Sequence, residues 1–163
     1  MTYQIDQSGK VENTSKLTVV VVANGISKSI VIKGTEKRKL VTAMKSLDYP
    51  KTNYVYKIFA AMIFLLIRVF KKNEVIYIDR EYPGHESVIK DTLIWLFAKE
   101  GHKVPQIGFS QIGKDSPAHH LAISIFRSEI KPNLITTANE ILKLFYKPKQ
   151  KIGRRSQSSR DNP

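Results

Sequence analysis

Apolar positions along the chain form short β-branched runs and longer segments with helical spacing. Residues 17–23 (LTVVVVA) precede Asn24-Gly25, and a second β-branched run follows within residues 26–33. Asn-Gly between two such runs predicts a β-hairpin, because both residues tolerate the positive φ of a type I′ turn. The nearly continuous apolar character of the first run is typical of a strand that is buried on both faces.

Helical and extended patterns alternate after this hairpin. Two further strands are predicted over residues 74–79 (EVIYID) and 104–112 (VPQIGFSQI). Ser116-Pro117 is typical of an N-cap followed by proline at the first helical position, and Thr137 with Glu140 forms a capping-box pattern. The apolar spacing predicts helices over residues 35–47, 52–72, 86–100, 117–129 and from 137 onward.

This order of elements predicts the fold class. Strands that alternate with helices after an opening hairpin indicate an α/β fold of three layers, with a mixed β-sheet and helices on both faces. A length of 163 residues favours one domain. We expect it to span residues 17–146, between a flexible leader at 1–16 and a disordered basic tail at 147–163.

One apolar segment raises the question of a membrane. Residues 58–67 carry no charge, but ten residues span only about 15 Å of helix, roughly half of a bilayer core. Lys57 and Arg68 bracket the run, so a buried core helix is the prediction and a membrane segment the alternative. Because the polar first 16 residues resemble no secretory signal, we expect a cytoplasmic protein.

Charge gives the first indication of a partner. The chain has 27 Lys and Arg against 14 Asp and Glu, a formal net charge of +13. Six bases and one acid in residues 147–163 place +5 there and +8 in the remainder. Such an excess favours an anionic partner, nucleic acid before a membrane surface, although a basic surface can also be merely solvated.

Several common chemistries are excluded by the sequence. The chain has no Cys, which rules out disulfides, thiol catalysis and cysteine-ligated zinc. It contains no GxxxxGK[ST] phosphate loop, no GxGxxG ahead of a helix, no GxSxG elbow and no HExxH zinc motif.

Acidic residues after the 74–79 strand are the first candidate site. Asp79 ends the strand, where open α/β sheets place ligands, and Glu81 and Glu86 follow within eight residues. Three such carboxylates suit a hard divalent cation such as Mg²⁺ or Mn²⁺. Alternatively, Asp79 caps a turn and Glu86 only favours a helix N-terminus.

Basic and imidazole side chains near Ser116 form a second candidate. His119 falls at the edge of the apolar helix face, which makes it a candidate general base or metal ligand, whereas His120 points to solvent. Lys114 precedes the helix and could contact a phosphate. The alternatives are a hydrogen-bonded, half-buried histidine and a solvated lysine.

Three segments carry a resemblance to a known family. The strand 76–79 (IYID) and the segments 107–110 (IGFS) and 114–122 (KDSPAHHLA), in this order of elements, resemble the ribonuclease H-like superfamily of nucleases and resolvases over residues 17–130. The resemblance implies carboxylates on a first strand, a fourth strand and a late helix that hold two divalent metals for phosphodiester cleavage. Asp79 would match the fourth-strand acid and His119 the late-helix ligand.

One part of the family pattern is missing in this alignment. The run 21–24 (VVAN), taken as the first strand, has no carboxylate, and the helix from Tyr54 carries Lys57 but no acid. Two functions therefore remain as expectations. The first is a metal-dependent nuclease or nuclease-like protein that acts on DNA or RNA, and the alternative is a catalytically inactive nucleic-acid-binding module of the same fold.

Both functions use particular side chains. The candidate catalytic and metal-binding residues are Asp79, Glu81, Glu86 and His119, with Mg²⁺ or Mn²⁺ as the expected cofactor. The expected partner is DNA or RNA, and no association with a membrane is expected. The candidate nucleic-acid-binding residues are Lys57, Arg80, Lys114, Lys149, Lys151, Arg154 and Arg155.

Overall fold

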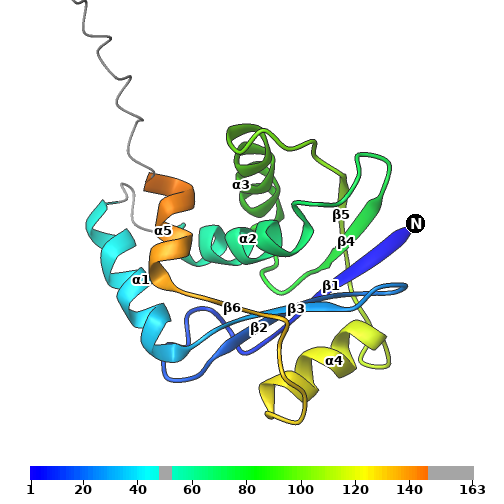
Figure 1. Ribbon diagram of the computed structural model, residues 1–163, viewed down its shortest axis with the longest axis horizontal. Coiled ribbons are helices and arrows are strands. Elements are labelled where there is room, and N and C mark those ends of the chain that lie inside the picture. Colours follow the sequence, from blue (N-terminus) through cyan, green and yellow to red (C-terminus); the bar gives the residue numbers. More distant parts are fainter. Residues whose placement is uncertain (48–52, 147–163) are drawn as a thin grey trace, which may run out of the picture.

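A computed structural model describes residues 1–47 and 53–146, which form an α/β fold with a mixed six-stranded sheet and five helices (Figure 1). The strand order is β5-β4-β1-β2-β3-β6. Neighbours β1, β2 and β3 are antiparallel, β4 runs parallel to β1 and to β5, and β6 runs parallel to β3. The strands are β1 (Thr2–Ser8), β2 (Thr18–Ala23), β3 (Lys28–Ile32), β4 (Val75–Asp79), β5 (Gln106–Ser110) and β6 (Leu134–Thr136).

The first strand corrects the expectation of a flexible leader at residues 1–16. β1 lies near the middle of the sheet, between β2 and β4, so both of its edges are hydrogen-bonded. Tyr3 and Ile5 are buried in the main core. Because the strand alternates these side chains with polar ones, its sequence lacks the continuous apolar run that marks β2. The short strand β6 was also not predicted.

The predicted hairpin is confirmed. β2 and β3 pair antiparallel, and Asn24 and Gly25 take φ of 89° and 104° at the turn between them. Val22 lies opposite Lys28, so the connection is longer than the two-residue loop of the simplest hairpin. Along β2, Val20 and Val22 face one core while Val19 and Val21 face another. Burial on both faces therefore explains the uninterrupted valine run.

Helices cover both faces of the sheet (Figure 1). Four of them, α1, α2, α3 and α5, pack on the larger core, and α4 packs on β1 and β2 from the opposite face through Ala118, Ala122 and Ile125. The helices are α1 (Gly34–Leu47), α2 (Tyr54–Ile67), α3 (Glu86–Lys99), α4 (Pro117–Phe126) and α5 (Ala138–Tyr146).

The apolar segment 58–67 lies within α2 and belongs to the main core, as its flanking charges predicted. Nearly all of its side chains are buried against the sheet and neighbouring helices. Within residues 1–47 and 53–146, no helix has the length and apolar character needed to cross a membrane.

A buried lysine holds the loop that follows β1. The Lys37 side chain on α1 is fully buried, and its ammonium donates to the carbonyls of Lys10 and Asn13 and to the Thr18 hydroxyl. Burial lowers the pKa of Lys37 to about 8. From the other side, the Tyr82 hydroxyl accepts from the backbone N–H of Val11 at 3.3 Å. The loop that connects β1 to β2 is therefore fixed at two points.

Candidate metal centre

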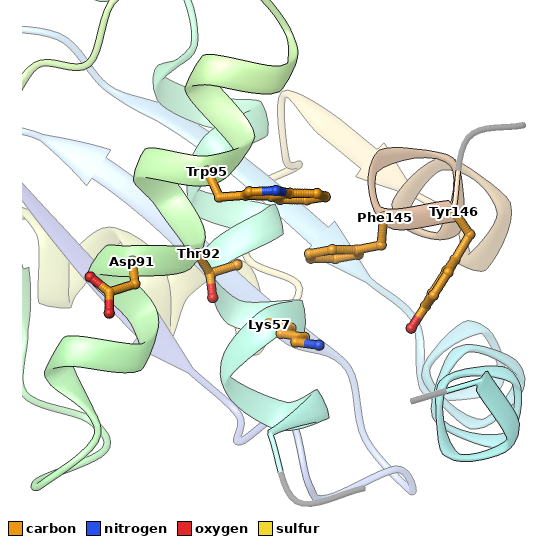
Figure 2. A pocket seen from close by; sticks show the side chains of 6 residues that line it. All are labelled: Lys57, Asp91, Thr92, Trp95, Phe145 and Tyr146. Atoms are coloured by element: carbon orange, nitrogen blue, oxygen red, sulfur yellow. The ribbon is translucent and has the colours of Figure 1, made fainter. Parts of the chain in front are cut away.

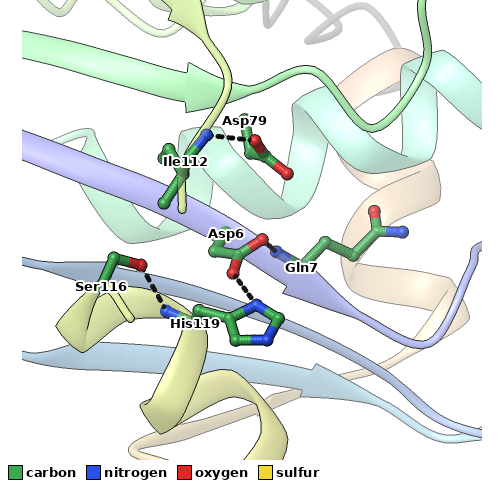
Figure 3. A network of polar contacts seen from close by, with 6 residues as sticks. All are labelled: Asp6, Gln7, Asp79, Ile112, Ser116 and His119. Atoms are coloured by element: carbon green, nitrogen blue, oxygen red, sulfur yellow. Dashed lines mark hydrogen bonds and ion pairs between the residues drawn. The ribbon is translucent and has the colours of Figure 1, made fainter. Parts of the chain in front are cut away.

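Two aspartates lie side by side on neighbouring parallel strands. Ile5 of β1 pairs with Ile78 of β4, so Asp6 and Asp79 follow at the same level of the sheet. Asp6 is only 2% exposed, and its Oδ1 accepts from the backbone N–H of Gln7 at 2.8 Å (Figure 3). A buried carboxylate needs such partners, because its desolvation is costly.

The segment after β4 brings a third carboxylate to the pair. The Asp79 Oδ1 accepts from the backbone N–H of Ile112 at 2.7 Å, which fixes the loop that follows β5 (Figure 3). The backbone N–H of Glu81 donates to the Asp79 carbonyl at 2.9 Å. This tight turn folds Glu81 back toward the strand end. One carboxylate oxygen each from Asp6, Asp79 and Glu81 then lies within 4.8 Å of the others. We call these three residues the acidic group.

Burial and neighbouring carboxylates raise the pKa values of Glu81 and Asp6. Burial raises the pKa of Glu81 well above its usual range, and the nearby charges of Asp79 and Asp6 raise it further. Burial also raises the pKa of Asp6, in spite of the hydrogen bonds from Gln7 and His119 that lower it. A group of acids in this state favours a bound cation, which would offset their mutual repulsion.

A histidine from the opposite layer contacts this acidic group. Ser116 caps α4 by accepting from the backbone N–H of His119 at 3.1 Å, and Pro117 occupies the first turn, as predicted. This start of the helix places His119 Nδ1 2.9 Å from Asp6 Oδ2 (Figure 3). An ionised Asp6 can only accept, so Nδ1 is then the donor. His119 thereby fixes the orientation of Asp6.

The acidic group opens into a surface pocket of about 530 Å³ that combines carboxylates with basic side chains. Arg80 and Lys114 line it beside Asp79 and Glu81. The carboxylates could hold a cation, and the basic side chains attract an anion. The pocket therefore suits an anionic ligand that also contacts a bound cation. The complete lining is Asp79, Arg80, Glu81, Pro83, Gln111, Ile112, Gly113, Lys114 and His119.

The structure brings together most, but not all, of the residues expected from the sequence. Asp79 and Glu81 belong to the acidic group, and His119 touches it through Asp6. Glu86 begins α3 and is not part of the group.

The candidate nucleic-acid-binding residues divide in the same way. Arg80 and Lys114 line the pocket of the acidic group. Lys57 lies on α2 and lines a different pocket. Lys149, Lys151, Arg154 and Arg155 lie outside the described residues.

The expectation that the first strand has no acid is wrong. Residues 21–23 belong to β2, whereas the first strand is Thr2–Ser8 and carries Asp6. A signal for it was present in the alternation of Tyr3 and Ile5 with Gln4 and Asp6. The polar composition of the leader concealed that alternation.

The donor set fits a hard divalent cation. Carboxylate oxygens are the ligands that Mg²⁺ and Mn²⁺ prefer, and three within 4.8 Å can share one or two ions. Hydrogen bonds from Gln7, His119 and Ile112 hold Asp6 and Asp79, so the orientation of both carboxylates is fixed by the fold.

Comparison with known proteins adds no family to this description. No protein-family model matches the chain, and no curated protein matches it.

Proposed function

We propose that this chain is a divalent-metal-dependent nuclease that cleaves DNA or RNA phosphodiesters in a three-layer, ribonuclease H-like domain. The observation that carries the proposal is the convergence of Asp6, Asp79 and Glu81 within 4.8 Å, where β4 ends beside the parallel strand β1. Asp6, Asp79 and Glu81 would hold the divalent metal, and a metal held there would supply the charge stabilisation that phosphodiester hydrolysis can use.

The position of each acid supports the resemblance to the ribonuclease H-like superfamily. That resemblance implies carboxylates on a first strand and a fourth strand, and a ligand on a late helix. Asp6 stands on β1, Asp79 on β4 and His119 on α4. Asp6 would match the first-strand acid that the resemblance implies.

The chain's own residues have distinct tasks in this proposal. Asp6, Asp79 and Glu81 would hold Mg²⁺ or Mn²⁺, which when bound supplies a Lewis acid and lowers the pKa of a coordinated water. His119 orients Asp6, and the backbone N–H of Ile112 orients Asp79. Arg80 and Lys114 line the same pocket and would attract the phosphate backbone.

The catalytically inactive nucleic-acid-binding module is now less well supported. The argument for the inactive module was the lack of an acid on the first strand, and that strand carries Asp6. The module retains the net charge of +13 as its support. An assay of cleavage separates the two functions, because both predict binding and only one predicts turnover.

The test is incubation of the full chain with single-stranded and duplex DNA and RNA, with Mg²⁺ or Mn²⁺ or with a chelator. We expect cleavage that requires the metal and falls at least about 100-fold in Asp6→Asn and Asp79→Asn, since each substitution removes one charged ligand. Both variants keep a side-chain oxygen that can accept the hydrogen bonds from Gln7 and Ile112.

The matched control is Glu129→Gln, which removes one exposed carboxylate outside the acidic group. It should cleave as the wild type does. Binding without cleavage by the wild type would support the inactive module instead. Equal cleavage by wild type and Asp79→Asn would contradict the proposed site.

A further inference from the structure

A second pocket, of about 500 Å³, lies between α2, α3 and α5, the helices that pack on the face of the sheet opposite to α4 (Figure 2). It is separate from the acidic group, which shares none of its lining residues. We call it the Trp95 pocket. Its lining is Lys57, Asp91, Thr92, Trp95, Phe145 and Tyr146.

Flat aromatic rings form one side of the Trp95 pocket. The Trp95 side chain is 47% exposed, although a large indole usually buries most of its surface. Its ring lies parallel to that of Phe145, with an interplanar angle of 4° and 6.0 Å between centroids (Figure 2).

Lys99 fixes the aromatic side of the pocket, which Trp95 and Phe145 form. The Lys99 ammonium lies 4.8 Å from the Trp95 ring centroid and donates to the Leu144 carbonyl, which ties α3 to the last turn of α5. The aromatic wall is therefore held in place before any ligand binds.

Polar groups stand beside these rings. The Asp91 carboxylate is exposed and has no hydrogen-bond or ion-pair partner among residues 1–47 and 53–146. The Thr92 hydroxyl donates to the Val88 carbonyl at 2.7 Å, so its oxygen can still accept. Lys57 supplies a positive charge from α2 (Figure 2). The pocket thus offers an aromatic face, acceptors and a cation.

We propose that the Trp95 pocket binds a nucleobase that carries an exocyclic amino group. A base stacks well on an exposed indole, and the acceptors Asp91 and Thr92 match an amino donor on the edge of adenine, cytosine or guanine. Uracil and thymine have no exocyclic amino group, and the carbonyl oxygen that replaces the amino group of cytosine can only accept, so the Asp91 carboxylate would repel it. The cation at Lys57 suits the attached phosphate. The base belongs either to a free nucleotide or to a single strand.

The Trp95 pocket can be tested directly because Trp95 is the only tryptophan of the chain. Its emission, excited near the red edge of tryptophan absorption, is followed while the full chain is titrated with AMP, UMP, a short oligo(dA) and a short oligo(dT). A chelator is present, so the carboxylate site takes no part. We expect saturable quenching by the adenine ligands and at least about tenfold weaker binding of UMP and oligo(dT). AMP and oligo(dA) together distinguish a free nucleotide from a strand as the source of the base.

Variants then assign the signal to this pocket. Phe145→Ala should weaken adenine binding at least about fivefold, and Asp91→Ala should reduce the preference for adenine over uracil ligands. The matched control is Ile94→Ala, an exposed residue of the same helix outside the pocket, which should bind as the wild type does. Melting curves verify that each variant is folded.

Three outcomes would overturn the proposal. The first is no saturable quenching by any of the four ligands. The second is equal affinity of wild type, Phe145→Ala and Asp91→Ala for adenine ligands. The third is quenching that appears only after residues 147–163 are deleted, which would show that this segment, rather than a base, occupies the pocket in the full chain.

Discussion

Among the three carboxylates, Glu81 is the one whose charged form the folded protein disfavours most. It is partly buried and lies within 4.8 Å of Asp6 and Asp79, so the folded protein favours its protonated form. Asp6 is more deeply buried, but hydrogen bonds from Gln7 and His119 stabilise its charge. Without a bound cation, the charge of Glu81 is therefore the main source of electrostatic destabilisation at the site.

The first prediction concerns the pH dependence of stability and follows from the raised pKa of Glu81. The pKa of Glu81 rises from 4.5 to about 8 on folding, so the stabilising contribution of its protonated form is complete below pH 4.5 and is lost as pH rises toward 8. Relative to wild type in a chelator, Glu81→Gln should therefore gain stability as pH rises from 4.5 to about 8. Because Glu81 is partly exposed, we expect about 1 kcal/mol, or ~2–4 °C in Tm.

Thermal or urea unfolding of both proteins at several pH values measures this difference. Taking the difference cancels the titration of groups that do not interact with Glu81, including Lys37. A stability difference that does not change with pH would contradict the assignment.

The second prediction separates two adjacent histidines. His119 contacts Asp6, whereas its neighbour His120 is exposed. His119→Ala should reduce metal-dependent cleavage about 10–100-fold and weaken metal affinity, because Asp6 loses the partner that orients it. His120→Ala is the matched control and should leave both quantities unchanged. The same effect from both substitutions would show that His119 has no particular role at the site.

At the scale of elements, the loop between β1 and β2 depends on one buried lysine. Lys37 joins α1 to this loop through two carbonyls and the Thr18 hydroxyl. The loop in turn follows directly on the strand that carries Asp6. Disturbing Lys37 should therefore affect both stability and the metal site.

The third prediction follows from that contact. Lys37→Met keeps the length of the side chain but leaves buried acceptors without a donor, which should lower stability by about 2–3 kcal/mol. Lys39→Met is the control, because Lys39 is exposed and its ion pair with Glu36 contributes little. Urea denaturation measures both. Equal stabilities of the two variants would show that the Lys37 contacts do not stabilise the fold.

The elements that could be predicted from the sequence are those whose local pattern agrees with their environment. The β2–β3 hairpin and the helices with caps at Ser116 and Thr137 were recognisable for this reason. β1 was not, because it places polar residues such as Asp6 and Gln7 in the centre of the sheet. β6 has only three residues and obtains its partner from β3, far away in sequence.

The candidate site shows the same limit. Asp79, Glu81 and His119 stood out because each follows or precedes a recognisable element boundary. Asp6 could not be placed without the pairing of β1 with β4, which is a tertiary contact. Glu86 was included because it is close in sequence, but it belongs to the start of α3 rather than to the acidic group.

At the scale of the whole molecule, a small acidic group is set in a strongly basic chain. The net charge is +13, of which residues 147–163 carry +5 by the count of their side chains. Bases attract a polyanion from a distance, whereas the acids act only at the pocket. In the proposed function, the two charge patterns would serve binding and chemistry separately.

The fourth prediction concerns residues 147–163. Their deletion should weaken binding of DNA or RNA, and should reduce the slope of log affinity against log salt by up to about 4–5, because fewer counterions are released. Cleavage at saturating substrate should persist. Fluorescence anisotropy at several salt concentrations measures the slope, and an unchanged slope would show that these bases do not contact the nucleic acid.

The central claim, that Asp6, Asp79 and Glu81 form a metal centre, is tested most directly by Mn²⁺ binding to the purified chain. Calorimetric titration, or the loss of the free Mn²⁺ resonance, gives the affinity. We predict saturable binding by wild type and by Glu129→Gln, and at least about tenfold weaker binding by Asp6→Asn and Asp79→Asn. Absence of binding, or unchanged affinity in Asp6→Asn, would contradict the account.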